Sequence, residues 1–441
     1  MIKNRTMLNG IVSGAMLVVS GSAIASGFAL LEQSASGLGN AYAGGAASAE
    51  DASTIFFNPA GMSRLKGTQV VVGGSFIKPS AKFSDAGSTP ASLQTTNNGN
   101  GGDAGSLAFV PNAYVSMEMN SKTHVGLGIN APFGLQTEYG SNWIGRFQAK
   151  KSKIQTVNLN PSVSYDVNET VSLGAGLNYQ RITGDLTSAV NYSAAAFAAG
   201  GAGLLGAIGG SNVEGVSTIS GSDSAWGYNL GALFNVDPQT RIGIAYRSKI
   251  KYNLSGTVSF SNVPGPLSAS SLLANGPVTL PITMPDSFSL SGIHQLDDRW
   301  DVMADATWTG WSVLQQLKID RTSGANVQTV QENWKNTWRV SAGTSYRYNM
   351  QWKARAGIAF DQAPVSDAYR TARIPDNNRI WLTVGGQYKA SKQAAIDFGY
   401  AHLFVNDSTI ADMQAASGKG NLVGTYSNSV DIISVQYAYS F

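Results

Sequence analysis

The chain contains no cysteine and only three histidines among its 441 residues. Without cysteine, no disulfide can staple the fold. The histidines at 124, 294 and 402 lie far apart in the sequence, and no HExxH motif is present. Nucleophilic and metal-dependent catalysis need clustered side chains of these types. We therefore expect no catalytic residue, no metal and no cofactor, and the sequence argues against a hydrolase or any other enzyme.

Charge and long apolar runs are also scarce. Charged residues make up 13% of the chain, about half the usual share. No window after residue 25 holds 18 uninterrupted apolar residues, so no transmembrane helix is expected. No basic tract points to nucleic acid as a partner. A chain poor in charge but rich in Gly, Tyr and Trp is typical of a transmembrane β-barrel; the alternative is a secreted β-sandwich or propeller.

Residues 1–25 have the features of a secretory signal peptide. Lys3 and Arg5 form a positive start, and a mostly apolar stretch follows over residues 11–24. Ala23-Ile24-Ala25 has the small-x-small pattern of a cleavage site. The apolar stretch is too short to span a membrane. We expect cleavage after Ala25 and export across the inner membrane.

Strict alternation of apolar and polar residues recurs from about residue 68 to the end of the chain. In the last segment Ile433, Val435 and Tyr437 share one face, whereas Ser434 and Gln436 share the other. One face can meet lipid and the other water, as a barrel strand requires. The sequence predicts fourteen such strands, which start near residues 68, 107, 123, 152, 171, 223, 240, 284, 300, 329, 352, 379, 393 and 429.

The connections between these strands alternate in length. Tight turns are expected at 120–122, 168–170, 237–239, 297–299, 349–351 and 390–392. Long loops are expected near 79–106, 138–151, 185–222, 260–283, 320–328, 363–378 and 404–428. Short turns on one side and long loops on the other are the outer-membrane arrangement. A sandwich or a propeller has no reason to alternate loop lengths so regularly.

The carboxyl terminus carries a separate signal. Phe441 ends the chain, and Tyr439 and Tyr437 precede it on the same face. This pattern resembles the terminal-strand signal read by the outer-membrane assembly machinery. It also fits an interfacial belt of aromatic residues, and the two interpretations are compatible.

Residues 26–66 precede the first strand and are rich in Gly, Ala and Ser. A barrel of fourteen strands is too wide for its own side chains to fill, and small residues let a backbone approach the wall closely. We predict that residues 26–66 form a hatch inside a barrel of residues 67–441. Asn58-Pro59-Ala60 reads as the turn that leads the chain into the wall. A solvated tail is the alternative, but Phe28 and Ile55 argue against it.

At this segment a family resemblance is plain. "GFALLEQSASGLGNAYAGGAASAEDASTIFFNPAGM" resembles the amino-terminal hatch of the FadL family, the outer-membrane transporters of long-chain fatty acids. Further matches are "NLNPSVSY" at 158–165, "MPDSFSLSG" at 284–292, "GIAFDQAPV" at 357–365 and "IPDNNRIWLTVGGQY" at 374–388. The resemblance implies a 14-stranded barrel plugged by its hatch, in agreement with the strand count.

The resemblance also implies a function. Long-chain fatty acids would enter by passive, ligand-gated diffusion through a monomer surrounded by outer-membrane lipid and lipopolysaccharide. Part of the family handles small aromatics, so a channel for aromatic hydrocarbons is the alternative. The outer loops could in addition serve as an adhesin or a phage receptor.

A fatty acid needs an apolar capture surface and a partner for its head group. The very apolar "AAAFAAGGAGLLGAIGG" at 194–210 lies in a predicted outer loop and could capture a ligand or pack against other loops. By parity, Lys335 and Arg339 share the water-facing side of the tenth strand. Either could bind the carboxylate or pair with an acid such as Asp305. The resemblance favours Lys335, and it places Phe28 against the bound tail.

Two further positions rest on the resemblance. Arg181 matches a residue associated with the ligand head, but its parity groups it with Leu177 and Tyr179. A bulge must reverse its side, or it lies beyond the lipid belt. The third strand contains "GINAPFG", and Pro132 lacks the N–H that a ladder needs. By resemblance, Pro132 and Gly134 form a kink that opens a lateral exit; a plain strand-end bend is the alternative.

Overall fold

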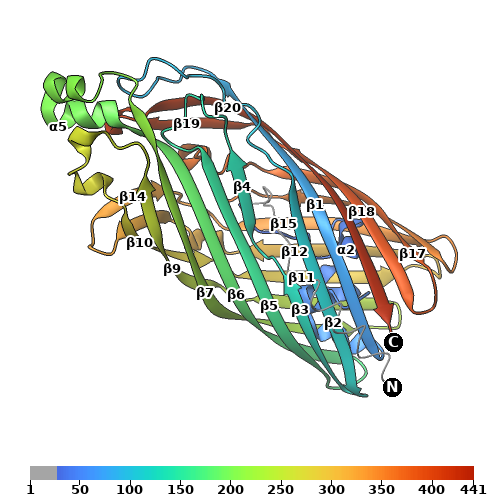
Figure 1. The fold of residues 1–441 in the computed structure, drawn as a ribbon. Coiled ribbons are helices and arrows are strands. Elements are labelled where there is room, and N and C mark those ends of the chain that lie inside the picture. Colours follow the sequence, from blue (N-terminus) through green and yellow to red (C-terminus); the bar gives the residue numbers. More distant parts are fainter. Residues whose placement is uncertain (1–26) are drawn as a thin grey trace.

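The alternating segments form twenty antiparallel β-segments of one sheet in the computed structural model, which describes residues 27–441 (Figure 1). β20 pairs with β1 from Gln69↔Ser440 to Asp85↔Gly424 and so closes the sheet into a barrel. The predicted signal peptide, residues 1–25, lies outside the described residues. Within residues 27–441 no helix is long and apolar enough to cross a membrane.

The segments follow one another around the wall. The first are β1 (Thr68–Asp85), β2 (Ala108–Asn120), β3 (Thr123–Asn130), β4 (Gly134–Glu138), β5 (Lys151–Asp166), β6 (Val171–Asn191), β7 (Glu214–Asn235), β8 (Thr240–Arg247), β9 (Ile250–Phe260) and β10 (Gly276–Met284). The others are β11 (Ser287–Gln295), β12 (Trp300–Thr309), β13 (Gln316–Arg321), β14 (Asn326–Gln331), β15 (Thr337–Arg347), β16 (Trp352–Asp361), β17 (Arg379–Lys389), β18 (Ala394–Val405), β19 (Ser408–Gln414) and β20 (Gly420–Ser440).

Helices are short and lie outside the wall strands. The α-helices are α2 (Ala35–Leu38), α3 (Gly45–Ser48), α4 (Thr54–Phe57) and α5 (Tyr192–Ala207). The 3-10 helices are η1 (Pro59–Arg64), η2 (Gly265–Leu267), η3 (Ser271–Leu273), η4 (Trp311–Val313), η5 (Asp367–Tyr369) and η6 (Ala415–Ser417). The first three α-helices and η1 belong to the predicted hatch, and α5 belongs to an outer loop.

Six wall strands consist of two consecutive segments each, namely β3/β4, β8/β9, β10/β11, β12/β13, β14/β15 and β18/β19. For example, β3 and β4 both pair with β5. β8 and β9 both pair with β7. The twenty segments therefore make fourteen wall strands, as the alternation predicted.

The two faces of the wall differ as the alternation requires. On β20, Ile433 and Val435 are about half exposed on the outer face, at 55% and 53%, whereas Ser434 and Gln436 are buried. Tyr437 continues the outer row below them. Apolar side chains therefore meet lipid outside, and small or polar side chains meet the contents of the barrel inside.

The predicted tight turns are present, but several outer loops are shorter than expected. Turns of two to four residues join β2 to β3, β5 to β6, β7 to β8, β11 to β12, β15 to β16 and β17 to β18. At the other end, β6 and β7 leave only residues 192–213 of the loop expected over 185–222. The ladder continues above the lipid, where nothing selects apolar side chains on one face. Sequence alternation therefore fades before the strand ends.

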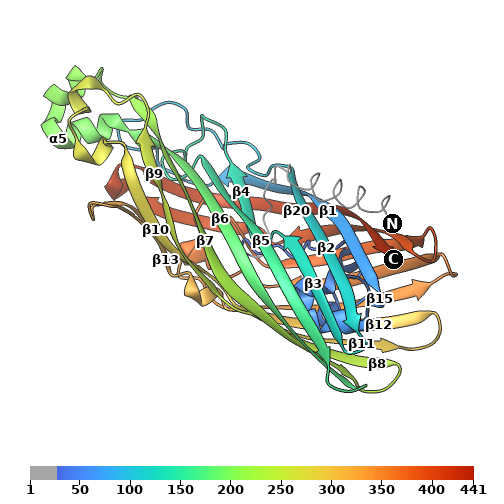
Figure 2. The same ribbon diagram turned by 60° about the horizontal axis from the view of Figure 1, so that its bottom comes forward.

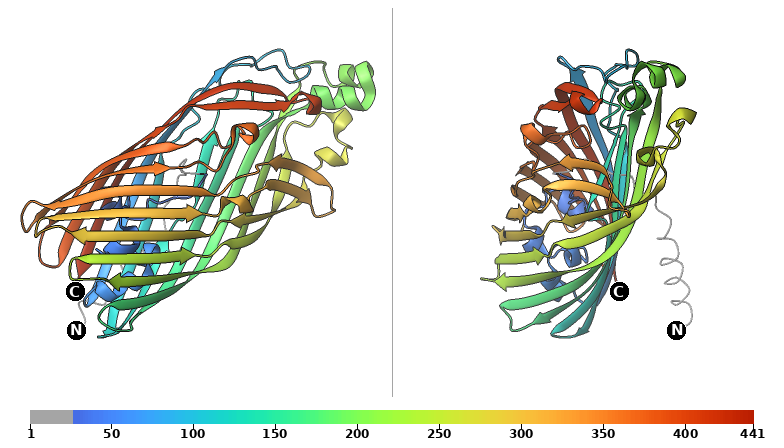
Figure 3. Two further views of the ribbon diagram at one scale, coloured as in Figure 1. Left: turned by 180° about the vertical axis from the view of Figure 1, so that it is seen from behind. Right: turned by 90° about the vertical axis from the view of Figure 1, so that its left-hand side faces the viewer.

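Residues 27–66 lie inside the wall, at the end where the carboxyl terminus is found (Figures 2 and 3). Many residues of this segment are fully buried, among them Leu38, Ala47, Ile55 and Ala60. Asn58 fastens the segment to β7. Its side chain donates to the Ala46 and Ala232 carbonyl oxygens at 2.7 and 3.0 Å, and it accepts from the Ala60 amide at 3.0 Å.

Glycines of the wall let this segment approach closely. A Cβ atom on Gly243 of β8 would lie 1.9 Å from the Ala46 carbonyl oxygen, and one on Gly357 of β16 would lie 2.3 Å from the Asn40 carbonyl carbon. Any larger residue would push these backbones apart. We call residues 27–66 the inner segment. Its small residues and the glycines of the wall therefore pack closely against each other.

Ionic contacts add to this packing. Arg355 of β16 binds Glu50 of the inner segment at 2.5 Å and Asp397 of β18 at 2.8 Å. Lys353 contacts the same Glu50 at 3.1 Å. The arginine and Asp397 side chains are fully buried, so each charge has its partner inside the protein.

Gly243→Ala tests the close approach of the two backbones. Because the added Cβ would meet backbone rather than a movable side chain, we expect a loss of about 1–3 kcal/mol in the free energy of unfolding. Thermal unfolding of the folded barrel in detergent measures it. The matched control is Gly292→Ala on neighbouring β11, where the nearest atom to a Cβ lies 4.0 Å away. Equal melting temperatures for the two variants would contradict the packing argument.

Candidate functional site

Phe28 sits in an aromatic cage inside the barrel. Its ring lies 4.9 Å from Trp311, 5.6 Å from Trp334 and 6.1 Å from Phe133, measured between centroids. The two tryptophans meet edge to face at 5.0 Å. All four side chains are buried, so the cage is an apolar site now filled by the chain's own phenylalanine.

The third wall strand is interrupted between β3 and β4, and the backbone beside Phe28 supplies hydrogen bonds there. Between β3 and β4, residues 131–133 turn away from the neighbouring strand β2 and pair with residues 28–30. The Leu30 amide donates to the Pro132 carbonyl at 2.8 Å, and the Gly134 amide donates to the Phe28 carbonyl at 2.9 Å. Ala29 and Phe133 face each other between these bonds.

The side chain of Gln33 supplies further hydrogen bonds to the interrupted strand. Its buried side-chain amide donates to the Ala131 carbonyl at 2.8 Å and accepts from the Ala131 amide at 3.3 Å. On the wall side, the Thr156 hydroxyl of β5 contacts both the amide and the carbonyl of Phe133. The backbone groups freed by the kink are thus bound by hatch and wall together.

A gap in the ladder adjoins the kink. Pairing of β2 with β3 ends at Ala113↔Ile129, and β4 pairs only with β5 in the described part of the chain. Residues 108–112 of β2 therefore have no strand partner on this side. The side-chain oxygen Oδ1 of buried Asn112 also finds no partner within residues 27–441. The ladder of the wall is incomplete here, and the predicted gate residues Pro132 and Gly134 lie beside this gap.

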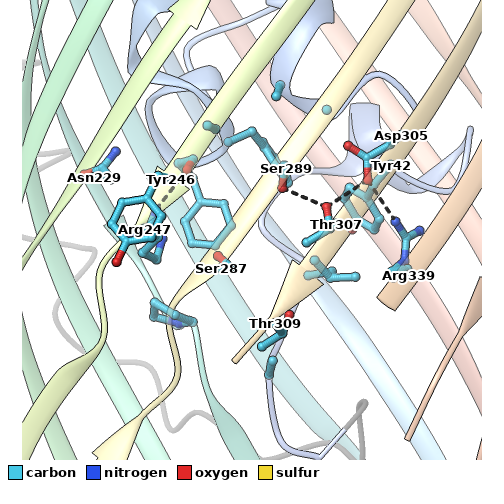
Figure 4. Close-up of a pocket in the computed structure, with 18 of the residues that line it drawn as sticks. Tyr42, Asn229, Tyr246, Arg247, Ser287, Ser289, Asp305, Thr307, Thr309 and Arg339 are labelled. Carbon is cyan, nitrogen blue, oxygen red and sulfur yellow. Dashed lines mark hydrogen bonds and ion pairs between the residues drawn. The ribbon is translucent and has the colours of Figure 1, made fainter. Parts of the chain in front are cut away.

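A cavity of about 120 Å³ lies between the hatch and the wall (Figure 4). It extends from Pro132 and Phe133 of the kink to Arg247 of β8 and Arg339 of β15. Ligand pockets usually measure about 300–1,000 Å³. The cavity is too small for a long ligand while the inner segment holds its present position.

Arg339 lines this cavity, and its guanidinium already contacts other groups of the protein. Its guanidinium donates to the Ala41 carbonyl of the inner segment and lies 3.8 Å from Asp305 of β12. It also lies 5.4 Å from the centroid of the Trp381 ring. The sequence left Arg339 either to bind a ligand carboxylate or to pair with an acid such as Asp305. The structure shows the pair with Asp305.

Comparison with known proteins identifies the family to which this barrel belongs. The family model for outer membrane protein transport proteins (OMPP1/FadL/TodX) matches residues 16–441. The chain belongs to this family. It is similar to the long-chain fatty acid transport protein of Escherichia coli K12, at 31% identity over 94% of this chain and 96% of the relative. It is also 32% identical to outer membrane protein P1 of Haemophilus influenzae, over 98% of each chain.

Comparison with solved structures supports the same family fold. A FadL homologue of Pseudomonas aeruginosa matches with a TM-score of 0.86 and 26% identity, over 94% of this chain and 99% of that chain. The Pseudomonas putida toluene transporter TodX matches with a TM-score of 0.67 and 20% identity, over 88% of this chain and 94% of that chain, and so shares the fold. The protein is a FadL-type outer-membrane transporter of hydrophobic molecules.

Two predicted head-group residues of this FadL-type chain do not reach the cavity. Arg181 is exposed on the outer face of β6, where it bonds Ser222 of β7 at 3.0 Å. The register of β6 with β7 runs without a bulge from Val171 to Asn191, so its side is not reversed. Lys335 is exposed and precedes β15. The strand parity assumed for Lys335 therefore does not apply.

Sequence reasoning missed several buried residues near the cage. Gln33 and Glu332 carry no local pattern, and Arg373 lies in a loop. Glu332 accepts a hydrogen bond from the Trp334 indole at 2.9 Å. Glu332 lies within "QENW" and Arg373 directly precedes "IPDNN", but only the fold brings 332 and 373 together.

The apolar loop segment forms a lobe at the end of the barrel opposite the carboxyl terminus (Figures 1 and 3). α5 is interrupted at Gly200 and Gly201 and packs with η2. Its base is tied down, because Tyr192 is buried and bonds the Ser261 carbonyl at 2.7 Å. Phe197 and Leu272 remain exposed, at 53% and 69%. The lobe is thus partly loop packing and partly an open apolar surface.

Gln33→Ala tests the repair of the kink. The truncation leaves the Ala131 amide and carbonyl without their buried partner, at a cost of about 1–3 kcal/mol. We expect faster amide hydrogen exchange at residues 131–134 with little change elsewhere in the wall. Mass spectrometry of exchanged peptides measures this difference. Gln69→Ala, which removes a contact with Ser440 on the far side of β1, serves as the control, and equal exchange at 131–134 in both variants would refute the role of Gln33.

Proposed function

We propose that this protein takes up long-chain fatty acids by passive diffusion that the ligand itself gates. Ligand is captured at the outer lobe around α5, passes to the aromatic cage of Phe28, and leaves sideways at the kink of Pro132 and Gly134. The observation that carries the proposal is the pairing of residues 28–30 with residues 131–133. The same short segment fills the apolar cage and closes the weak point of the wall.

The energetics fit a long apolar tail. Each buried methylene contributes roughly 0.8 kcal/mol, so a sixteen-carbon tail gains on the order of 10 kcal/mol before entropic costs. A ligand that enters the cage must displace Phe28, because the four rings are packed and buried. Displacing Phe28 pulls on the bonds of residues 28–30 to the kink. Binding energy is thereby coupled to opening of the wall.

The relatives favour fatty acids over aromatic hydrocarbons. Curated relatives named long-chain fatty acid transport protein align over nearly the whole chain. The FadL homologue matches with a higher TM-score than the toluene transporter. A channel for aromatic hydrocarbons remains the second candidate, and competition between labelled oleate and excess toluene for uptake separates the two.

A disulfide between hatch and kink tests the proposed gate. Ala29→Cys with Phe133→Cys places two thiols on residues that face each other in an antiparallel bridge, where Cα atoms lie close enough for a disulfide. The chain has no other cysteine. We expect cells with the oxidised double variant to lose most uptake of labelled oleate and to regain it after reduction.

The single-cysteine variants control for the lost phenylalanine and alanine side chains. Each should transport equally well under oxidising and reducing conditions. Uptake by the oxidised double variant at the rate of its reduced form would rule out a gate at this pairing. Uptake equal to that of cells without the protein, under all conditions and for the unmodified chain, would rule out fatty acid transport.

A further inference from the structure

Arg247 of β8 is a cation inside the barrel without a carboxylate partner. Its guanidinium donates to the Asn178 side-chain oxygen at 2.6 Å and to the Phe56 carbonyl oxygen of the inner segment at 2.8 Å. It also lies 4.4 Å from the centroid of the Phe56 ring. These partners are neutral, and Arg247 forms no ion pair within residues 27–441. Asp286, which precedes β11, instead accepts from the Tyr246 hydroxyl at 3.1 Å.

The arginines described above differ from Arg247 in this respect. Arg339 lies 3.8 Å from Asp305, and Arg355 contacts Glu50 at 2.5 Å. A charge held inside a protein without an opposite charge is costly. A guanidinium also has more N–H donors than the two that Arg247 uses among the described residues. Arg247 therefore has both a charge and free donors to offer to an anion.

Two hydroxyl groups extend this cation into a polar row on the wall. Ser287 of β11 pairs directly with Arg247, and Thr309 of β12 pairs directly with Ser287, so the three side chains share one face of the sheet. Figure 4 shows them around the cavity. In the next row, Ser289 and Thr307 bond each other at 2.7 Å. The hydroxyls of Ser287 and Thr309 have no hydrogen-bond partner in the described part of the chain.

The opposite side of the same cavity is apolar. Leu30 and Phe57 of the inner segment and Phe133 of the kink line it. Phe133 also packs against Phe28 in the aromatic cage, at 6.1 Å between centroids, so the cavity adjoins the cage. A ligand tail that replaces Phe28 in the cage can therefore place its head group in the cavity, against Arg247. An apolar lining with a few convergent polar groups fixes the orientation of a ligand.

We propose that Arg247, Ser287 and Thr309 bind the anionic head group of the transported ligand in this cavity. The inference rests on the proposed uptake and deepens it, because it defines the ligand class as amphiphiles with an apolar tail and one anionic end. The guanidinium supplies the charge, and the hydroxyls donate to the remaining oxygens of the head group. A carboxylate, a sulfonate or a sulfate monoester fits this set of donors. A hydrocarbon does not, because it leaves the charge of Arg247 uncompensated.

Two probes with the same sixteen-carbon tail test the site, namely hexadecane-1-sulfonate, which stays ionised at neutral pH, and hexadecan-1-ol. Equilibrium binding of the labelled probes to the purified protein in nonionic detergent gives both affinities. In Arg247→Met we expect the sulfonate to bind about tenfold or more weakly, since a hydrogen bond between charged groups is lost. The affinity for the alcohol should change less than about threefold, because the contacts of the tail remain. Arg247→Lys keeps the charge and should recover most of the affinity for the sulfonate.

Ser287→Asp is a second variant that keeps Arg247 and its contacts with the inner segment. The introduced carboxylate lies directly opposite Arg247 and occupies its charge. We expect this variant to bind the sulfonate about tenfold or more weakly than Ser287→Asn, which has the same shape without the charge. Arg181→Met is the matched control, because it removes a guanidinium from the outer face of β6. It should bind both probes like the unmodified protein.

Equal affinity for the sulfonate in Ser287→Asp and in the unmodified protein would overturn the inference. An equal fall for both probes in Arg247→Met would do the same, since Arg247 would then only hold Phe56 in place. In both cases binding of the probes by the unmodified protein would leave the proposed function standing. If the unmodified protein bound neither probe, the proposed function would fail together with this inference.

Discussion

A barrel wall in a membrane must satisfy every backbone N–H and C=O group within the protein, because lipid offers no hydrogen bonds. The third wall strand departs from this rule at residues 131–133, and the missing partners come from Phe28, Leu30 and Gln33 of the inner segment. The backbone groups at this kink therefore have their partners only while that segment is in place. In the proposed function, displacement of Phe28 by a ligand would also break the bonds that close the wall beside it.

The inner segment is held at two levels by different forces. Deep in the barrel, close backbone packing against wall glycines and the buried contacts of Glu50 with Arg355 fix α2 and α3. Nearer the cage, residues 28–30 are held by a short ladder and by aromatic contacts. The first set is extensive and rigid, whereas the second involves few hydrogen bonds. Local opening is expected where fewer contacts must be lost.

The polar groups inside the barrel serve mainly to satisfy one another. Arg339 pairs with Asp305 and a hatch carbonyl, and Arg355 joins Glu50 to Asp397. These arginines therefore contact partners within the protein in the described structure. Several buried acids nevertheless keep one oxygen without a partner among the described residues, namely Glu32, Glu332 and Asp397.

The sequence by itself determined the wall, because lipid and water impose a period of two on every strand that crosses the membrane. Fourteen strands, tight turns on one side and the resemblance of residues 27–62 could all be predicted from the residues. The sites could not. Arg181 and Lys335 are exposed and do not line the cavity. Gln33, Glu332 and Arg373 carry no sequence pattern that marks them. Only the closed barrel brings residue 28 to residues 133, 311 and 334, since these contacts depend on how the inner segment packs and not on local periodicity.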